Sequence, residues 1–368
     1  MVTISLCMIV KNEEDVIGRC LESVKDLVDE IIIVDTGSTD QTKKIVSSFT
    51  KKIYDFKWID DFAKARNFSF KKATKEYILW LDADDIFLEE DRKKLGQLKK
   101  NLDPSVDSVS MFYNLTMDEN GKPVMRLRRN RLVKRSKGFK WIGPVHEYLE
   151  VGGHIITSDA AVTHASIHHD SDRNLRIYEN RLKQGEKFSP RDLYYFANEL
   201  KDHQQYKRAV EYYEKFLSDG KGWIEDNLAA CGKLADCYHE LSNQEKMIYS
   251  VLRSFKYESP RPEFCCRLAY TFFEKMDYHS AIYWYKQAAA IGVLASSWGM
   301  QNQAYADWIP HIQLCVCYDR LGDYKLSQYH NEQAGSIRPE NPQYLHNKRY
   351  LEQVFALQNK KESHNEQE

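Results

Sequence analysis

The chain lacks the features of a membrane or secreted protein. None of its 368 residues falls in an apolar run long enough to span a bilayer, and Met1 leads directly into an apolar segment without a basic flank or a signal cleavage site. Its charges nearly cancel, because 53 lysines and arginines face 54 aspartates and glutamates for a formal net charge of −1. We therefore expect a cytoplasmic protein with no membrane span and with no nucleic acid as its main partner.

Cysteine pairs of the kind that bind zinc are also missing. The chain has eight cysteines, none of them in a C-x-x-C pair, and six stand among apolar neighbours on helical patterns. They are Cys7, Cys20, Cys231, Cys237, Cys265, Cys266, Cys315 and Cys317. We interpret them as small buried hydrophobic side chains rather than as zinc ligands or disulfides.

What is present indicates two domains. Hydrophobic residues make up 42% and charged residues 29% of the chain, as in a soluble globular protein, and the length exceeds that of one typical core. The first half alternates strand and helix patterns, whereas the second half is almost entirely helical and rich in tyrosine. We predict an α/β domain over residues 1–170, a helical domain over 171–358 and a disordered polar tail over 359–368.

The strands of the first half indicate a parallel sheet covered on both faces. Near-continuous apolar segments such as residues 31–34 (IIIV) require burial on both sides by crossover helices. Strands are predicted at residues 3–10, 30–35, 51–56 and 76–81, and helices at about 13–27, 40–49 and 61–73. Residues 106–117 and 123–133 flank an Asp-Glu-Asn-Gly turn and predict a hairpin added to the sheet.

The helical half contains recurring units. Each has a tyrosine followed three residues later by a small residue, at 206–209, 278–281 and 324–327, with a weaker unit around 241–255. These units resemble tetratricopeptide repeats, in which a small residue on the second helix lets paired helices pack closely. Their irregular spacing predicts three or four degenerate repeats with an insertion near 292–308, and a homodimer through the repeats is a further expectation.

Paired acids follow the last predicted strand of the first half. Asp82 and Asp84 come directly after the apolar run 77–81, and Asp85 stands behind them. Open α/β sheets bind ligands at the carboxyl edge of their strands. Acids one residue apart repel one another unless a cation neutralises them, although acidic turns are also common on solvated surfaces. The pattern therefore indicates a metal-assisted ligand site.

Other polar side chains are expected at the same edge. Asp35 ends the second strand, where its carboxylate can accept hydrogen bonds from a base or a ribose, whereas Asp40 is better explained as a helix cap. Residues 11–14 (KNEE) follow the first strand. Arg66, on the third helix, is either a solvated residue or a guanidinium aimed at the crevice to bind a uracil carbonyl or a phosphate.

Four motifs occur in a characteristic order. They are residues 5–14 (SLCMIVKNEE), 33–40 (IVDTGSTD), 62–67 (FAKARN) and 79–85 (LWLDADD), followed by 141–147 (WIGPVHE) and 162–164 (VTH). Together they resemble the inverting family 2 glycosyltransferases, which implies a Rossmann-like GT-A nucleotide-sugar domain before the helical repeats. With its repeats the chain is similar to the peptide S-glycosyltransferases of glycosylated bacteriocins, and lipopolysaccharide-core glucosyltransferases share the motif set.

The resemblance implies a sugar donor linked to uridine diphosphate (UDP), with UDP-glucose the first expectation. Asp35 and Arg66 would hold the uracil side, and Asp82 the ribose. The implied donor-binding residues are Val10, Asn12, Glu13, Asp35, Arg66, Asp82 and Ala83.

The resemblance also implies a divalent cofactor, Mn²⁺ or Mg²⁺. Asp84 would coordinate the metal that bridges the diphosphate, and His164 would complete the metal shell. An imidazole ligand favours Mn²⁺, because Mg²⁺ prefers oxygen alone. The alternative is that His164 is a surface histidine.

Glu147 is the candidate catalytic base. Family members commonly carry an acid–acid pair at this place, whereas this chain has His146 before Glu147. His146 is therefore an alternative base or a residue that orients the acceptor, and Glu147 alternatively only pairs with a nearby arginine.

Eight basic residues lie between Arg126 and Lys140. Such a run is typical of a nucleic-acid patch, but its alternation fits a strand with a solvated face. A place beside the diphosphate, or along a path for an acidic acceptor, is favoured over RNA binding.

The predicted function is metal-dependent transfer of a sugar, with inversion, to a peptide cysteine or serine. The alternatives are transfer to lipopolysaccharide or another cell-surface glycan, and an inactive transferase domain that serves as a protein-binding adaptor. A nucleotidyltransferase is disfavoured, because residues 11–14 offer no glycine-rich loop after the first strand.

Overall fold

The computed structural model describes residues 1–117, 121, 123–165, 172–292 and 302–365, and it divides into two compact units. Unit 1 is Met1–Tyr195 and unit 2 is Phe196–Glu368. The division falls later than the predicted boundary at residue 170. Helix α5 (Asp172–Lys183) and the start of α6 (Pro190–Asp202) belong to unit 1, where Arg191 donates to the carbonyl of His146. Each unit is described by itself.

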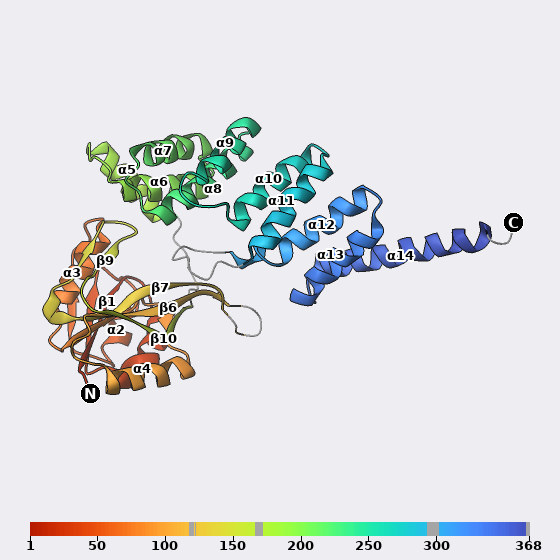
Figure 1. Cartoon of the computed structure of the whole chain (residues 1–368). Coiled ribbons are helices and arrows are strands. Elements are labelled where there is room, and N and C mark those ends of the chain that lie inside the picture. Colours follow the sequence, from red (N-terminus) through yellow and green to blue (C-terminus); the bar gives the residue numbers. More distant parts are fainter. Residues whose placement is uncertain (118–120, 122, 166–171, 293–301, 366–368) are drawn as a thin grey trace. The chain divides into compact units, whose positions relative to one another are not determined.

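Unit 1 is built on a mixed eight-stranded sheet (Figure 1). In spatial order its strands are β3 (Ile53–Asp55), β2 (Glu30–Asp35), β1 (Ile4–Val10), β4 (Tyr77–Trp80), β7 (Pro123–Lys134), β6 (Ser108–Met117), β10 (Ile155–His164) and β5 (Asp85–Ile86). Strands β1 to β4 are mutually parallel, and β7 joins them antiparallel to β4. The predicted hairpin is confirmed, because β6 and β7 pair antiparallel.

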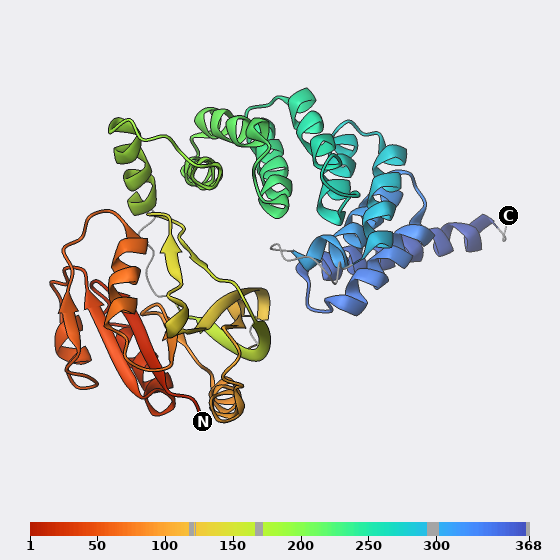
Figure 2. The same ribbon diagram turned by 60° about the vertical axis from the view of Figure 1, so that its left-hand side comes forward.

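Side chains of the strands alternate between two apolar clusters. Leu6 and Leu79 belong to the cluster on one face, whereas Cys7 and Trp80 belong to the cluster on the other. Helices α1 (Ile17–Val24), α2 (Thr42–Val46) and α4 (Glu89–Asn101) cover the first face, and α3 (Phe62–Lys72) covers the second. Figure 2 shows α3 and α4 on different sides of the strands. The predicted α/β class with both faces covered is confirmed.

Several elements were missed by sequence reasoning. Helix α4 is highly charged, and Leu95 is its one fully buried leucine, so its apolar stripe is weak. Strands β8 (Lys140–Ile142) and β9 (Tyr148–Glu150) form a separate two-stranded sheet, and each is only three residues long. Short segments of this kind carry almost no periodic signal.

Unit 2 is a succession of helices in which each packs against the next. After α6 these are α7 (Tyr206–Asp219), α8 (Ile224–Glu240), α9 (Gln244–Ser254), α10 (Pro262–Glu274), α11 (Tyr278–Ile291), α12 (Trp308–Arg320), α13 (Tyr324–Ile337) and α14 (Pro342–Asn365). The small residues Ala209, Ala281 and Ser327 are fully buried, as close packing of paired helices requires. The predicted helical domain of tetratricopeptide-like organisation is confirmed.

Several further predictions concern the tail, the insertion, the cysteines and membrane spans. The tail predicted as disordered from residue 359 is helical as far as Asn365, because α14 continues through it. Most of the predicted insertion, residues 293–301, lies outside the described residues. All eight cysteines are free and buried, which confirms their interpretation as packing residues. Among the described helices, none is long and apolar enough to cross a membrane.

Glu30, at the start of β2, is a buried acid that stabilises unit 1. Its carboxylate accepts hydrogen bonds from Lys52, from Ser5, and from the backbone and hydroxyl of Thr74 at 2.9 Å. Burial opposes its ionisation, but the hydrogen bonds prevail and lower the pKa of Glu30 to about 2. A lowered pKa contributes stability above the unfolded-state pKa of about 4.3, and that stability is lost as pH falls towards 2.

We predict that Glu30→Gln lowers the free energy of unfolding of unit 1 by about 2 kcal/mol at pH 7. The difference from the parent protein should shrink as the pH falls from 4.5 towards 2, because the parent then loses the same charge. Urea denaturation at a series of pH values measures this difference in the free energy of unfolding. Glu90→Gln, at an exposed position of α4, is the matched control and should change little at any pH. If the difference in unfolding free energy between the parent and Glu30→Gln stayed constant with pH, Glu30 would not be the stabilising charged group.

Candidate active site

The carboxyl edge of the parallel strands collects most of the predicted site residues. Register pairs Val10 of β1 with Asp35 of β2, and β4 leads directly into Asp82. Strand β10 ends at His164, which pairs with Asp85 in the antiparallel contact with β5. The strand topology thus brings residues from distant parts of the sequence to one edge of the sheet.

Asp84, Asp85 and His164 form a cluster suited to a cation. Their ligand atoms all lie within 4.8 Å of one another, with His164 Nδ1 3.6 Å from Asp84 Oδ2 and 3.9 Å from Asp85 Oδ1. Burial, together with the charges of Asp82 and Asp85, raises the pKa of Asp84. The proximity of Asp85 and the other acids raises the pKa of His164 despite burial. The structure brings Asp84 and His164 together, as expected, and adds Asp85, which sequence reasoning left unassigned.

Asp85 is fixed by a buried arginine. Its Oδ2 lies 2.9 Å from Arg131 Nη1, both side chains are 0% exposed, and the same oxygen accepts the backbone N–H of Asp82 at 3.0 Å. The guanidinium of Arg131 lies 3.9 Å from the ring centroid of Trp80 and 4.5 Å from that of Tyr113. Asp85 Oδ1 is buried and has no hydrogen-bond partner among the described residues. One oxygen therefore anchors the loop, and the other remains beside Asp84 and His164.

Arg66 joins the acidic loop to the candidate base. It reaches from α3 to Asp82 Oδ1 and to Glu147 Oε1, at 2.6 Å each. Its guanidinium lies 5.1 Å from the ring centroid of Trp80 and 4.7 Å from that of Trp141. Arg66 is therefore buried rather than solvated. Although burial opposes its ionisation, the charges of Arg66 and Arg131 lower the pKa of Asp82.

The two candidate bases have different surroundings. Glu147 pairs with Arg66, which is the alternative that the sequence left open for it. His146 has a left-handed backbone with φ of 48°, and its ring stacks on Tyr195 at 4.3 Å between centroids. Its carbonyl accepts hydrogen bonds from Arg191 at 3.0 and 3.1 Å. The imidazole is thus packed on α6, and the carboxylate of Glu147 lies on the side of Arg66.

The loops after β1 and β2 bind each other. Asn12 Oδ1 accepts the backbone N–H of Thr39 at 2.8 Å, and Asp35 Oδ1 accepts those of Gly37 and Ser38 at 2.9 Å each. Asp35 therefore holds the turn that follows β2 through one of its carboxylate oxygens. Its Oδ2 is buried without a hydrogen-bond partner in the described structure. Asp40 Oδ1 accepts the N–H of Thr42, the first residue of α2, at 2.9 Å, but the N-cap of this helix is Gln41 rather than the predicted Asp40.

Glu13 is also close enough to the acidic loop to be affected by it. Burial, followed by the charges of Asp84 and Asp82, raises the pKa of Glu13 to about 7, while Arg173 opposes the shift. Val10 and Ala83 are buried beside these loops. The carboxyl edge is therefore strongly negative, and a cationic ligand would relieve the repulsion.

The basic run from 126 to 140 does not form one solvated face. Arg126 and Arg128 lie over the ring of Phe112, and Arg128 donates to the carbonyl of Ser158 at 3.1 Å. Arg131 is buried, as described above. Arg126 at the start of the run and Arg135, Lys137 and Lys140 at its end are exposed. The burial of Arg131 could have been predicted from strand alternation, because Arg131 and the buried Val133 are two residues apart and lie on the same face of β7.

We predict that Arg131→Met destabilises unit 1 by about 3 to 5 kcal/mol, because Asp85 then remains buried without its partner. Adding Asp85→Asn to Arg131→Met should restore part of the loss, because the unpaired charge is removed. Thermal or urea denaturation measures both variants. Lys140→Met, at the exposed end of the same run, is the control and should change little. If Arg131→Met alone were as stable as the parent, the Arg131–Asp85 pair would not be a structural anchor.

Comparison with known proteins gives a family match for the N-terminal region. Residues 5–160 match the model of Glycosyl transferase family 2. The SPbeta prophage-derived glycosyltransferase SunS of Bacillus subtilis is 30% identical over 234 residues, which cover 60% of this chain and 54% of that protein. A TPR repeat-containing protein of Synechococcus elongatus is 37% identical over 150 residues, 41% of this chain and 36% of that protein.

A third relative is the lipopolysaccharide core biosynthesis glycosyltransferase LpsC of Rhizobium meliloti. It is 28% identical over 164 residues, which cover 41% of this chain and 58% of that protein. The chain thus spans less than two thirds of the length of each of these three relatives.

Proposed function

Because the N-terminal region carries a family 2 glycosyltransferase domain, we propose that this chain transfers a sugar from a UDP-sugar to an acceptor with inversion at the anomeric carbon. The observation that carries the proposal is the carboxyl edge of the sheet. There the Asp84–Asp85–His164 cluster lies next to the Asp82–Arg66–Glu147 chain of ion pairs. Groups able to hold a metal and a nucleotide therefore stand beside a carboxylate able to take a proton.

The donor would bind across the loops that follow β1, β2 and β4. The buried Oδ2 of Asp35, which lacks a partner among the described residues, suits the N–H of a uracil ring. Asp82, held ionised by Arg66, would accept a hydrogen bond from the ribose. Arg66 uses two of its donors on Asp82 and Glu147, so we assign it to orienting these two carboxylates. Asn12, which ties the first two loops together, would shape the base pocket.

A divalent cation would be held by Asp84, by Oδ1 of Asp85 and by His164. The fit rests on the buried Asp85 oxygen without a hydrogen-bond partner and on the repulsion among the surrounding acids. Two carboxylates with one imidazole suit Mn²⁺ better than Mg²⁺. When bound, the cation offsets charge that builds up on the departing diphosphate.

Glu147 would accept the proton of the attacking acceptor group. Its carboxylate is fixed by Arg66, which also holds the donor-side Asp82, so one guanidinium sets the base relative to the nucleotide. The attack breaks the bond from the anomeric carbon to the diphosphate and forms the new glycosidic bond in one displacement. A single displacement inverts the configuration.

We propose a peptide cysteine or serine as the acceptor. The alignment with SunS is longer than the segment matched by the family model, so the likeness extends beyond the catalytic domain. The resemblance of the chain to peptide S-glycosyltransferases supports this choice. The second candidate acceptor is a lipopolysaccharide core, which the likeness to LpsC favours.

We predict that UDP release from one of a panel of UDP-sugars requires Mn²⁺ and falls at least about 100-fold in Asp84→Asn, since a metal contributes several kcal/mol. A coupled assay for UDP measures the rates. Asp159→Asn, at an exposed position of β10, is the matched control and should keep the parent rate. Release that is equally fast without metal would contradict the assignment of the cluster. No release and no nucleotide binding would favour the adaptor alternative.

Glu147→Gln should separate the role of base from that of ion-pair partner. The amide oxygen still accepts the Nε–H of Arg66, so we expect a folded enzyme with unchanged donor binding but a rate lowered about 10²- to 10⁴-fold with a serine acceptor. With a cysteine in the same peptide the loss should be smaller, because a thiol of pKa about 8.5 ionises more readily. Equal losses would contradict the thiol argument. Glu150→Gln, on the exposed side of β9, is the control.

A further inference from the structure

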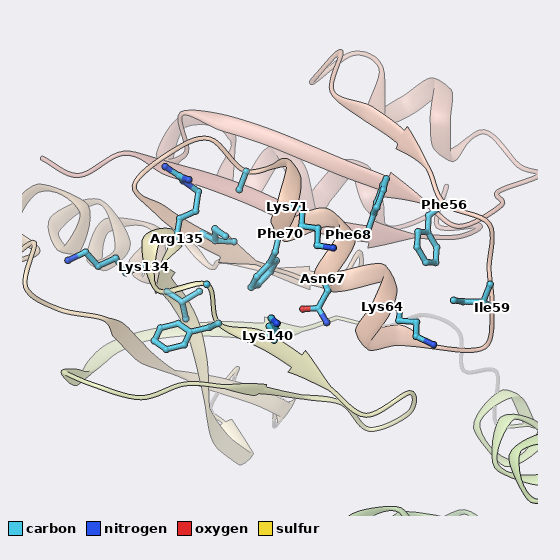
Figure 3. Close-up of a pocket in the computed structure, with 15 residues that line it drawn as sticks. Phe56, Ile59, Lys64, Asn67, Phe68, Phe70, Lys71, Lys134, Arg135 and Lys140 are labelled. Carbon is cyan, nitrogen blue, oxygen red and sulfur yellow. The ribbon is translucent and has the colours of Figure 1, made fainter. Parts of the chain in front are cut away.

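A pocket opens beside α3, and none of the assigned active-site residues lines it (Figure 3). Its volume is about 670 Å³, which is within the usual range for small-molecule sites. Helix α3, the end of β7 and the start of β8 line it. None of the described residues that line it is used by the donor, metal or base assignments above.

The floor of the pocket is apolar. Phe70, Ala73, Ile78 and Val133 belong to the buried cluster that packs between α3 and the sheet, and all four line the pocket. Phe56 and Phe68 form an aromatic pair on one wall, with ring centroids 5.4 Å apart. An apolar or aromatic group would therefore remove hydrophobic surface from water on entering.

The rim of the pocket is cationic. Its charged lining residues are Lys64, Lys71, Lys134, Arg135 and Lys140, and none of the described lining residues is acidic. Three of these cations have partners: Lys64 pairs with Asp61, while Lys134 and Arg135 donate to backbone carbonyls. Lys71 and Lys140 are exposed and have no ion pair within the described structure. A ligand with a negative group would meet two available ammonium groups.

The rim lysines on α3 lie on the side of the helix away from Arg66, whereas Phe70 of the pocket floor lies on the same side as Arg66. At 100° per residue, Lys64, Phe68 and Lys71 point away from Arg66, which faces Asp82 and Glu147. Asn67 closes the wall between the two sites, because its amide exchanges hydrogen bonds of 2.9 Å with the backbone of Trp141. The ring of Trp141 in turn covers Arg66. A pocket ligand would therefore not need the donor site.

We infer that this pocket is a separate binding site for a small amphipathic anion. An apolar or aromatic body would fill the floor at Phe70 and Ile78, and a sulfonate, carboxylate or phosphate group would lie between Lys71 and Lys140. The inference goes beyond the proposed sugar transfer and does not depend on it. It also gives a role to the exposed end of the basic run, which the proposed transfer leaves unused.

Fluorescence titration of the full chain with anilinonaphthalene sulfonate, an aromatic anion, tests the site. Lys71→Gln combined with Lys140→Gln should weaken binding about tenfold, because two charge-assisted contacts are lost. The matched control combines Lys44→Gln with Lys100→Gln, two exposed lysines of unit 1 outside the pocket. It should bind as the parent does. Equal binding by the two double variants would overturn the inference.

Competition tests the chemistry of the ligand. Naphthalene sulfonate should displace the probe, whereas the neutral naphthalene sulfonamide and the compact methanesulfonate should do so only weakly. If the sulfonamide displaced the probe as well as the sulfonate does, binding would depend on apolar contacts alone. That result would overturn the inference. Asp84→Asn should leave probe binding unchanged, and displacement by UDP with Mn²⁺ would assign the probe to the donor site instead. Loss of sugar transfer with intact probe binding would contradict only the proposed function.

Discussion

The structure of unit 1 depends on how charge is balanced at the carboxyl edge of its sheet. Asp82, Asp84 and Asp85 lie within four residues of one another in a short loop, where Asp85 is fully buried and the other two are partly buried. Two buried arginines, Arg66 and Arg131, offset part of this charge, and the ring of Trp80 contacts both guanidinium groups. Removal of either arginine would leave a carboxylate inside the protein without its partner. The geometry of the acidic loop therefore depends on the packing of the core.

The same constraint explains why the added strands matter. Strand β7 supplies Arg131 to the acidic loop, β10 supplies His164, and the segment around β8 supplies Trp141 above Arg66. A parallel sheet ending at β4 would carry the acids and Arg66 but would lack Arg131 and His164. The hairpin and the strands after it therefore complete the site, and they also enclose the basic pocket beside α3.

Much of this was predictable from local patterns. The apolar runs predict the buried strands, the Asp-x-Asp motif after residues 77–81 predicts the acidic edge, and the small residues at repeat positions predict the paired helices of unit 2. Helix α4 and the short strands β8 and β9 were missed, because charged helices and three-residue strands have little periodicity. Asp84 and His164 were placed together only through a family resemblance, since they are 80 positions apart in the chain.

The sequence by itself determined the fold class, the two-part organisation and the acidic edge, because these follow from hydrophobic periodicity and from residues adjacent in the chain. Only the tertiary structure decided that Arg131 is buried against Asp85, that Glu147 pairs with Arg66, and that one oxygen of Asp35 is occupied while the other is not. The physical reason is that burial and pairing depend on contacts between distant segments. A basic or acidic residue has the same letter in the sequence whether water or a buried partner balances its charge.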